Sequence, residues 1–248
     1  MSGWLRVVGL GPGPDKWLTP EAHDVLHAAT DIVGYIPYVE RVPATARAKR
    51  HASDNRVELE RAQQALQAAA CGARVAVVSG GDAGVFGMAA ALFEAMEKGD
   101  AAWRVLDVAV VPGMTALLAA AARVGAPLGH DFCVISLSDQ RKPWSVIQLR
   151  LKAACEGDFV LAVYNPASST RREQLEAALA QLRVARGADT VAVAATSVGC
   201  KDERVMVTTL GALDAAQVNM RTLLIIGSTK TRAVGRFVYT PRTYAEAL

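Results

Sequence analysis

An apolar run from Val75 to Val78 leads directly into a glycine-rich loop, Ser79–Gly87, whose only charged residue is Asp82. An alanine-rich segment, Met88–Lys98, follows the loop. A short apolar run bounded by turn residues is typical of a strand buried on both faces, so the stretch predicts a strand, a sharp turn and a helix. Glycines in such a turn let the backbone approach a ligand closely. A plain connecting loop with a solvated Asp82 remains the alternative on these residues alone.

The same alternation of strand and helix recurs along the whole chain. In a chain of 248 residues it predicts two α/β domains, 1–127 and 128–248, with a ligand site in the cleft between them. The turn-rich segment Gly125–Gly129 is the candidate boundary. The predicted strands are 5–10, 31–34, 75–79 and 104–111 before this boundary, and 132–137, 159–163, 191–195, 205–209 and 223–227 after it.

The first glycine motif, Gly9–Pro14, does not fit a Rossmann nucleotide site. It reads G-x-G-x-G, and Pro12 and Pro14 remove two of the N–H groups that a dinucleotide loop would direct at a pyrophosphate. The next helix is predicted to begin only after Thr19, which is a good N-cap residue followed by Pro20. A helix that begins so late cannot direct its dipole at a phosphate in the preceding loop.

Charge and composition exclude several classes of protein. The formal net charge is only +3 and no basic run is interleaved with aromatic residues, which argues against nucleic-acid binding. No apolar run approaches the roughly 20 residues that cross a bilayer, and the N-terminal sequence lacks a signal-peptide pattern, so we expect a cytoplasmic protein that does not bind membranes. Four widely spaced cysteines are expected to be reduced: Cys71, Cys133, Cys155 and Cys200.

No metal site is expected. His23 and His27 have the i, i+4 spacing of metal ligands on a helix, but no third ligand lies nearby in the sequence. An exposed helix face explains the pair better.

Positive charge is concentrated in one segment. Between Glu40 and Asp54 the cationic residues far outnumber the acidic ones, which is typical either of a solvated loop or of a site for a polyanionic ligand. The basic residues are Arg41, Arg47, Lys49, Arg50, His51 and, just beyond, Arg56.

Four of the predicted loops, together with Thr19–Ala22, closely resemble the tetrapyrrole (corrin/porphyrin) methylase family: Gly9–Pro14, Ser79–Gly87, Pro112–Ala116 and Tyr164–Arg171. The resemblance runs over essentially the whole chain and implies an S-adenosylmethionine-dependent methyltransferase without the Rossmann-type methyltransferase fold. This chain departs from the family at Ala83, where relatives usually carry proline. That change puts the rigidity of the loop in doubt more than its binding of the cofactor.

Three longer segments resemble the branch of the family that methylates C17 of a precorrin and contracts the macrocycle in cobalamin synthesis. They are His130–Asp139, Tyr164–Arg171 and Thr222–Ser228. Another methylase of the same fold, acting on precorrin-4 at C11 or on a cobalt-containing precorrin, remains an alternative, and so does a non-catalytic module that binds an adenosine ligand. The segment His51–Arg56 is more similar to the oxygen-dependent, metal-free branch.

The resemblance also implies roles for individual residues. Gly11 and Pro12 would line the substrate side of the site, and the cations Arg47, Lys49, Arg50 and Arg56 would pair with the acetate and propionate groups of the ring. We also expect a homodimer. The residues expected to bind S-adenosylmethionine are Gly80, Gly81, Asp82, Val85, Phe86, Thr115, Ala116, Tyr164, Asn165, Ser197 and Thr222.

Ring contraction needs protons to be moved, whereas methyl transfer from a sulfonium needs mainly correct positioning. The candidate acid–base residues are His51, Asp54, His130, Ser138 and Asp139. His51 and Asp139 are preferred, with His51 slightly ahead because its reference pKa is nearer neutral. An ordinary exposed loop histidine remains equally compatible with the sequence.

Overall fold

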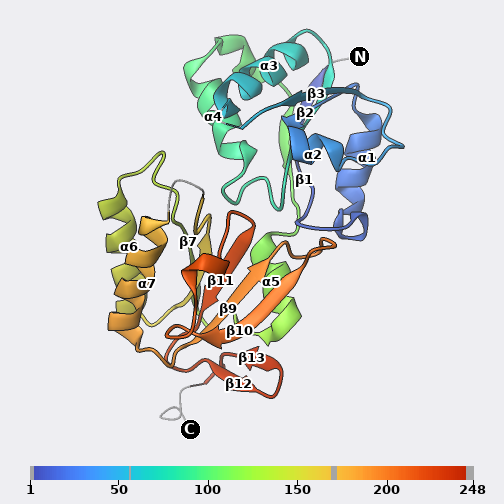
Figure 1. The fold of residues 1–248 in the computed structure, drawn as a ribbon. Coiled ribbons are helices and arrows are strands. Elements are labelled where there is room, and N and C mark those ends of the chain that lie inside the picture. The colour runs from blue at the N-terminus through green and yellow to red at the C-terminus, as the bar shows by residue number, and fades with distance from the viewer. Residues whose placement is uncertain (1–2, 56, 169–171, 244–248) are drawn as a thin grey trace. The chain divides into compact units, whose positions relative to one another are not determined.

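The computed structural model describes residues 3–55, 57–168 and 172–243, and the chain divides into two compact units, Met1–Ala116 and Leu117–Leu248 (Figure 1). Each unit has its own five-stranded sheet. Among the described residues, no helix is long and apolar enough to cross a bilayer.

The sheet of the first unit is entirely parallel. Its strand order is β3-β2-β4-β1-β5, so the central β4 and β1 carry neighbours on both edges. Because all five strands run the same way, the loops that follow them leave the sheet at one common edge. The strands are β1 (Trp4–Gly9), β2 (Asp31–Tyr35), β3 (Lys49–Ser53), β4 (Arg74–Ser79) and β5 (Val108–Val111).

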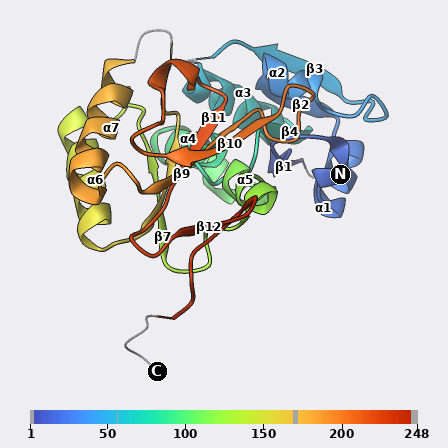
Figure 2. The same ribbon diagram turned by 60° about the horizontal axis from the view of Figure 1, so that its bottom comes forward.

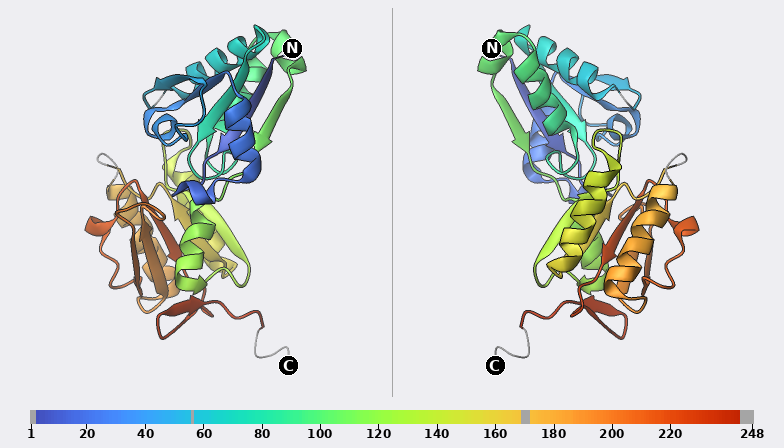
Figure 3. Two further views of the ribbon diagram at one scale, coloured as in Figure 1. Left: turned by 90° about the vertical axis from the view of Figure 1, so that its right-hand side faces the viewer. Right: turned by 90° about the vertical axis from the view of Figure 1, so that its left-hand side faces the viewer.

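Helices cover both faces of this sheet. Figure 3 shows the blue α1 in front of the strands in one panel and the green α4 in front of them in the other. Thr19 accepts a hydrogen bond from the N–H of Ala22 at 3.1 Å and caps α1, as the sequence predicts. The helices are α1 (Pro20–Ala28), α2 (Ile36–Glu40), α3 (Glu58–Ala70) and α4 (Met88–Lys98), with short 3-10 turns η1 (Asp15–Trp17) and η2 (Ala101–Val105).

Alternate residues of the strands pack into two separate cores. Val75 and Val77 of β4 pack with α3 and α4, while Ala76 and Val78 pack on the opposite face with α1. A strand buried on both faces needs an almost continuous apolar sequence, and the run before the glycine loop is of this kind.

The second unit has a mixed sheet with the order β10-β9-β11-β8-β7. Only β7 and β8 are parallel, and the other neighbours are antiparallel. A three-stranded sheet, β12-β13-β6, pairs two strands near the end of the described chain with β6, which follows α5. The strands are β6 (Gly125–Ala126), β7 (Phe132–Ser136), β8 (Val160–Tyr164), β9 (Val191–Thr196), β10 (Arg204–Thr209), β11 (Thr222–Ile226), β12 (Arg232–Val234) and β13 (Phe237–Tyr239).

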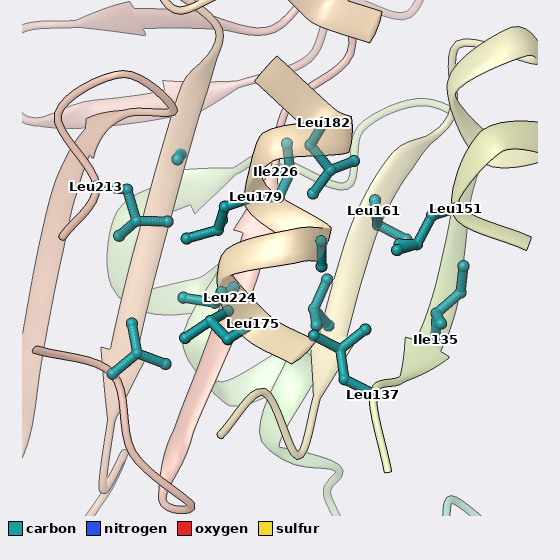
Figure 4. Packing of buried hydrophobic residues seen from close by; sticks show 14 of the residues in the cluster. Ile135, Leu137, Leu151, Leu161, Leu175, Leu179, Leu182, Leu213, Leu224 and Ile226 are labelled. Atoms are coloured by element: carbon teal, nitrogen blue, oxygen red, sulfur yellow. The ribbon is translucent and has the colours of Figure 1, made fainter. Parts of the chain in front are cut away.

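Two long helices cover one face of this mixed sheet, and α5 lies along the other (Figure 2). Figure 4 shows the leucines of α7, Leu175, Leu179 and Leu182, directed at the sheet residues Leu161 and Leu224. The helices are α5 (Ala116–Val124), α6 (Trp144–Glu156) and α7 (Glu173–Arg186), with a 3-10 turn η3 (Ala215–Gln217).

The buried side chain of Arg186 connects the ends of α6, α7 and β11 by hydrogen bonds. The Arg186 guanidinium donates hydrogen bonds to the carbonyls of Ala154 and Phe159, at 2.9 and 2.5 Å, and to that of Gly227. Its side chain is only 2% exposed, so the end of α7 is fixed to the end of α6 and to the residue after β11.

The α/β fold expected from the sequence is confirmed, with differences in detail. The division between the units falls after Ala116, earlier than the expected position at residue 127. The reason is that α5 and β6 belong to the second unit: the N–H of Leu117 donates to Tyr164 Oη at 2.9 Å, and β6 pairs with β13. In addition, Lys49–Ser53, expected as part of a basic loop, forms the edge strand β3.

We predict that Leu179→Ala lowers the free energy of unfolding by about 2–5 kcal/mol, because it leaves a cavity in a closely packed core. Leu179 is 1% exposed. Leu149→Ala on α6 is the matched control, because Leu149 is 67% exposed and its truncation should change stability by less than about 0.5 kcal/mol. Urea denaturation followed by circular dichroism measures both. Equal losses in the two variants would contradict this account of the core.

Candidate active site

Three loops of the first unit meet at the carboxyl edge of its parallel sheet. They follow β1, β4 and β5, and the first two are joined by an isolated bridge in which Gly11 and Gly81 exchange N–H···O hydrogen bonds of 3.0 and 2.9 Å. The N–H of Leu10 also donates to the carbonyl of Ser79 at 2.9 Å. The backbone groups that a dinucleotide loop would offer a phosphate are therefore partly used between the loops themselves.

Asp82 connects the second loop to the third. Its Oδ1 accepts the N–H of Gly84 at 2.8 Å, and its Oδ2 accepts the N–H of Gly113 at 3.0 Å. A carboxylate that accepts two backbone N–H groups forms charge-assisted hydrogen bonds, which are stronger than neutral ones. Asp82 therefore holds the shape of the glycine loop, in addition to any contact it makes with a ligand.

Glycine is required at several of these positions for different reasons. A Cβ at Gly9 would lie 2.7 Å from the nitrogen of Gly113, so the first and third loops can approach only without side chains. Gly81 has a φ of +69°, and its vacant Cβ position meets only backbone atoms of residues 114–116, at 3.9–4.0 Å. A side chain at position 81 would thus be in van der Waals contact with the third loop, and the fold brings Gly81 together with Thr115 and Ala116, which are also expected cofactor-binding residues.

Val85 and Phe86 lie on the surface of the same loop. They are 37% and 54% exposed, and Phe86 has a φ of +54°, which is unusual for a residue with a side chain. An exposed aromatic ring held in a strained conformation is a feature of ligand-binding loops.

Arginines of the basic segment mostly bind the protein itself. Arg41 Nη2 donates to the carbonyls of Leu10, Gly11 and Gly13, at 3.3, 2.9 and 2.9 Å, and so holds the first loop. Arg50 donates to one carbonyl of α2 and to two carbonyls of the turn after it, at 2.8–3.1 Å. Arg47 and Lys49 are exposed, and Arg56 lies outside the described residues. The role of Arg41 as a clamp could not be read from the sequence, because its partners are carbonyls 28–31 positions away.

His51 lies in the middle of β3, and Asp54 lies just after its end. His51 is level with Val33 in the middle of the strand, and its Nε2 lies 2.7 Å from Oδ1 of Asp31, the first residue of β2. Burial opposes ionisation of Asp31, yet hydrogen bonds from His51 and Thr30 bring its pKa below the usual value. Asp54 follows the end of β3, at the edge where the glycine loops leave the sheet. The histidine thus reaches away from that edge, and the aspartate lies at it.

In the second unit, strand register places several of the expected cofactor-binding residues at one edge of the five-stranded sheet. Ser136 pairs with Tyr164, and Thr196 pairs with Thr222. Asn165 Nδ2 donates to Ser136 Oγ at 3.0 Å, and the hydroxyls of Thr196 and Thr222 lie 2.7 Å apart. Because β11 is antiparallel to both β8 and β9, the end of β8, the end of β9 and the start of β11 coincide.

Residues other than glycine with a positive φ are concentrated in the expected site. Of the four in the described part of the chain, Phe86, Asn165 and Ser197 are expected cofactor-binding residues. The fourth, Asp158, bonds the backbone and hydroxyl of Thr229 and has a structural explanation. Backbone strain of this kind is concentrated at functional sites in folded proteins.

The remaining acid–base candidates lie at opposite ends of strand β7 in the second sheet. Ser138 and Asp139 follow the end of β7, at the same edge as Tyr164 and Asn165, and Asp139 Oδ2 accepts a hydrogen bond from Gln174 at 3.0 Å. His130 precedes β7 and therefore lies at the opposite end of that sheet, with Nδ1 3.8 Å from Asp131. Of these three, the geometry favours Ser138 and Asp139 as groups that act beside Asn165.

The histidine pair on α1 shows the arrangement of an exposed helix face. The rings of His23 and His27 lie 4.1 Å apart, and Nε2 of His27 is 2.8 Å from the hydroxyl of Thr45. Within residues 3–55, 57–168 and 172–243, no three His, Cys, Asp or Glu side chains form a group that could hold a metal ion. The four cysteines are free thiols.

The chain is similar to proteins of one known family. The family model "Tetrapyrrole (Corrin/Porphyrin) Methylases" matches residues 5–214. The chain is 51% identical over 252 residues to precorrin-3B C17-methyltransferase of Sinorhizobium sp, covering all of this chain and 99% of that protein. It is 42% identical over 243 residues to a protein of Salmonella typhimurium described as a probable cobalt-factor III C17-methyltransferase, covering 97% and 99% of the two chains.

Solved structures show the same fold. The crystal structure of the methyltransferase CobJ is 47% identical and has a TM-score of 0.94, covering 97% of this chain and all of that one. The uroporphyrin-III C-methyltransferase of Thermus thermophilus complexed with S-adenyl homocysteine has a TM-score of 0.66 at 24% identity, over 91% and 92% of the two chains, and this likeness shows the fold alone. From the family model and the full-length identity together, we conclude that this chain belongs to the tetrapyrrole (corrin/porphyrin) methylase family.

Proposed function

We propose that this protein is an S-adenosylmethionine-dependent methyltransferase that methylates C17 of precorrin-3B, with contraction of the ring to precorrin-4, in cobalamin biosynthesis. The observation that carries the proposal is the 51% identity, over the full length of both chains, to a precorrin-3B C17-methyltransferase. The loops that meet beside Gly81 support it, because they form a site shaped by backbone, in which a small ligand can be held closely.

The residues present fit S-adenosylmethionine. Gly81 has no side chain to cover its backbone beside residues 114–116, and the exposed side chains of Val85 and Phe86 offer apolar surface to a purine or a ribose. Asp82 would act chiefly by holding Gly84 and Gly113 in the conformation that admits the ligand. Tyr164, Asn165, Ser197 and Thr222 are our candidates for the remaining contacts to the same ligand.

When bound, S-adenosylmethionine supplies a methyl group on a sulfonium that is already activated for transfer. The chain's own contribution to that step is orientation. Correct positioning of two reactants can lower the activation free energy by several kcal/mol, roughly 7–11 in favourable cases. The hydrogen bonds that join the loops at Gly11, Gly81, Asp82 and Gly113 preserve this orientation, because they fix the loops before any ligand binds.

Contraction of the ring requires a proton to be held or moved at an oxygen of the hydroxylated macrocycle. We propose Asp139, with Ser138 beside it, for this role. Asp139 lies at the same sheet edge as Tyr164 and Asn165, whereas the His51 imidazole is engaged by Asp31 away from the loop edge of its sheet. These positions support Asp139 for this role over His51, which reference pKa values slightly favour.

The activity is tested by incubating the protein with S-adenosylmethionine and either precorrin-3B or cobalt-factor III, and recording product mass and absorbance. We expect turnover of precorrin-3B. Preferential turnover of the cobalt-containing substrate would favour the activity described for the Salmonella relative. Absence of methyl transfer to either compound would refute the proposal.

Asp82→Ala should weaken binding of S-adenosylhomocysteine at least about fivefold, since the N–H groups of Gly84 and Gly113 lose their acceptor and an unsatisfied polar group costs about 1–3 kcal/mol. Isothermal titration calorimetry measures the affinity. Asp100→Ala is the matched control, because Asp100 Oδ1 also accepts a backbone N–H, that of Ala102 at 2.8 Å, and caps η2. If Asp82→Ala binds as tightly as Asp100→Ala, the loop does not depend on this carboxylate.

Replacing Arg47 and Lys49 together by glutamine should raise the KM for the tetrapyrrole severalfold at low ionic strength and leave S-adenosylhomocysteine affinity unchanged. Both side chains are exposed, so the effect should shrink as salt screens the charges. Arg104→Gln removes an exposed cation whose Nη2 donates to the carbonyl of Glu97, and it serves as the control. An unchanged KM at low salt would identify the pair as ordinary solvated charges.

Asp139→Asn should slow formation of the contracted product by roughly 100-fold or more, the usual contribution of a general acid or base, while S-adenosylhomocysteine still binds. Product mass and absorbance after a single turnover give the rate. Asp131→Asn is the control, because Asp131 lies at the opposite end of β7 and its side chain is 81% exposed. Contraction at the wild-type rate in Asp139→Asn would move the role to another group.

A further inference from the structure

Tyr38 has no role in the site described so far, although it lies beside it. It is in α2, the short helix that directly follows β2 and therefore begins at the edge of the sheet where the glycine loops lie. Its ring packs against the core that contains Val78 and Val39. The sequence motif Tyr35-Ile36-Pro37-Tyr38 thus delivers an aromatic side chain to the loop edge.

The ring of Tyr38 lies directly against the start of the glycine loop. A Cβ placed on Gly80 would be 2.5 Å from Cε1, 2.7 Å from Cζ and 3.0 Å from Oη of Tyr38. Any side chain at position 80 would therefore displace the tyrosine. Gly80 consequently admits the Tyr38 ring and its hydroxyl to the neighbourhood of Gly81 and Asp82.

The hydroxyl of Tyr38 receives no hydrogen bond from, and donates none to, any residue that the structure describes. The hydroxyl of Tyr164, in contrast, accepts the N–H of Leu117 at 2.9 Å. Tyr38 is only partly buried, so its hydroxyl can take a hydrogen-bond partner from solvent or from a bound ligand.

Two guanidinium groups act electrostatically on this hydroxyl. Arg41 holds the loop at Gly11, and the buried Arg61 donates to the carbonyl of Asp54 at 2.6 Å and to Ser53 Oγ at 2.8 Å. Burial nevertheless raises the pKa of Tyr38 above its usual value, and the two arginines only partly offset this. The group therefore keeps its proton at neutral pH and is a hydrogen-bond donor in a positive field.

Such a donor suits an anionic oxygen, whereas a sulfonium would be repelled by the same arginines. We propose that the Tyr38 hydroxyl donates a hydrogen bond to a side-chain carboxylate of the tetrapyrrole, and that Tyr38 is a residue that determines substrate affinity. The inference rests on the proposed function. It adds an uncharged hydrogen-bond donor to the proposed substrate site, and the basic segment does not provide such a donor.

The test compares Tyr38→Phe with Tyr35→Phe. The two rings are neighbours, 5.4 Å apart and edge to face, and both changes remove only a hydroxyl. Tyr38→Phe should raise the KM for precorrin-3B at least about tenfold, because a hydrogen bond to a charged group contributes about 1.5–3 kcal/mol. It should leave the affinity for S-adenosylhomocysteine within twofold. Tyr35→Phe should leave both quantities within twofold.

A second measurement compares two forms of the substrate, with and without free carboxylates. Absorbance titration gives the affinity of wild type and of Tyr38→Phe for precorrin-3B and for the same compound with its carboxylates as methyl esters. The two proteins should bind the ester equally and should differ only on the free acid. A pH series from 6.5 to 8.5 should leave the difference constant, because the tyrosine stays protonated throughout.

The outcomes separate the inference from the proposed function. If Tyr38→Phe has wild-type KM while the wild-type protein turns over precorrin-3B, the inference is overturned and the function stands. If the variant loses S-adenosylhomocysteine affinity instead, the hydroxyl serves the cofactor and the inference is again overturned. If the wild-type protein transfers no methyl group, both fail.

Discussion

The two hydrogen bonds that the Asp82 carboxylate accepts, from the N–H groups of Gly84 and Gly113, hold the candidate site of the first unit in shape. They connect the loop after β4 to the loop after β5, while the Gly11–Gly81 bridge connects it to the loop after β1. Three loops from three strands thus become one structure. Preorganisation of this kind reduces the conformational entropy that a ligand would otherwise have to overcome on binding.

The parallel sheet makes this arrangement possible. Because β1, β4 and β5 run in one direction, their following loops meet at one edge, and close approach there requires glycine at Gly9 and Gly113. The second unit also brings site candidates together at one sheet edge, although its strands are not all parallel. Its β8, β9 and β11 alternate in direction, so two strand ends and one strand start coincide at the edge that carries Tyr164, Ser197 and Thr222.

Guanidinium groups of the first unit act largely on the protein's own carbonyls. Arg41 holds the first loop, Arg50 holds the turn after α2, and Arg61 holds the end of β3. Each donates hydrogen bonds to partly buried backbone oxygens, some of which also accept a backbone N–H. Their charges still act on the site, however, and the Tyr38 hydroxyl lies within the field of two of them. The basic segment therefore contributes to structure and to recognition through different residues.

Local sequence determined much of this protein. The apolar run Val75–Val78, the Thr19 cap and the glycine loops predict strands, a helix start and the loop edge, because backbone geometry and burial on two faces restrict which residues can occupy those positions. The resemblance to the family, carried by the same loops, led to the methyltransferase function. These features depend on neighbours along the chain, so they can be read without the fold.

Tertiary structure decided what depends on residues distant in sequence. The polar run Lys49–Ser53 forms an edge strand only because β2 is available as its partner, and neither its composition nor its pattern shows this. The position of His130 at the far end of β7 and the pairing of His51 with Asp31 follow from the arrangement of the strands. The engagement of Arg41 and Arg50 depends on carbonyls of other segments that the fold brings near them. The place of Tyr38 against Gly80 likewise required the fold, because contact across more than forty residues is set by packing and not by local preference.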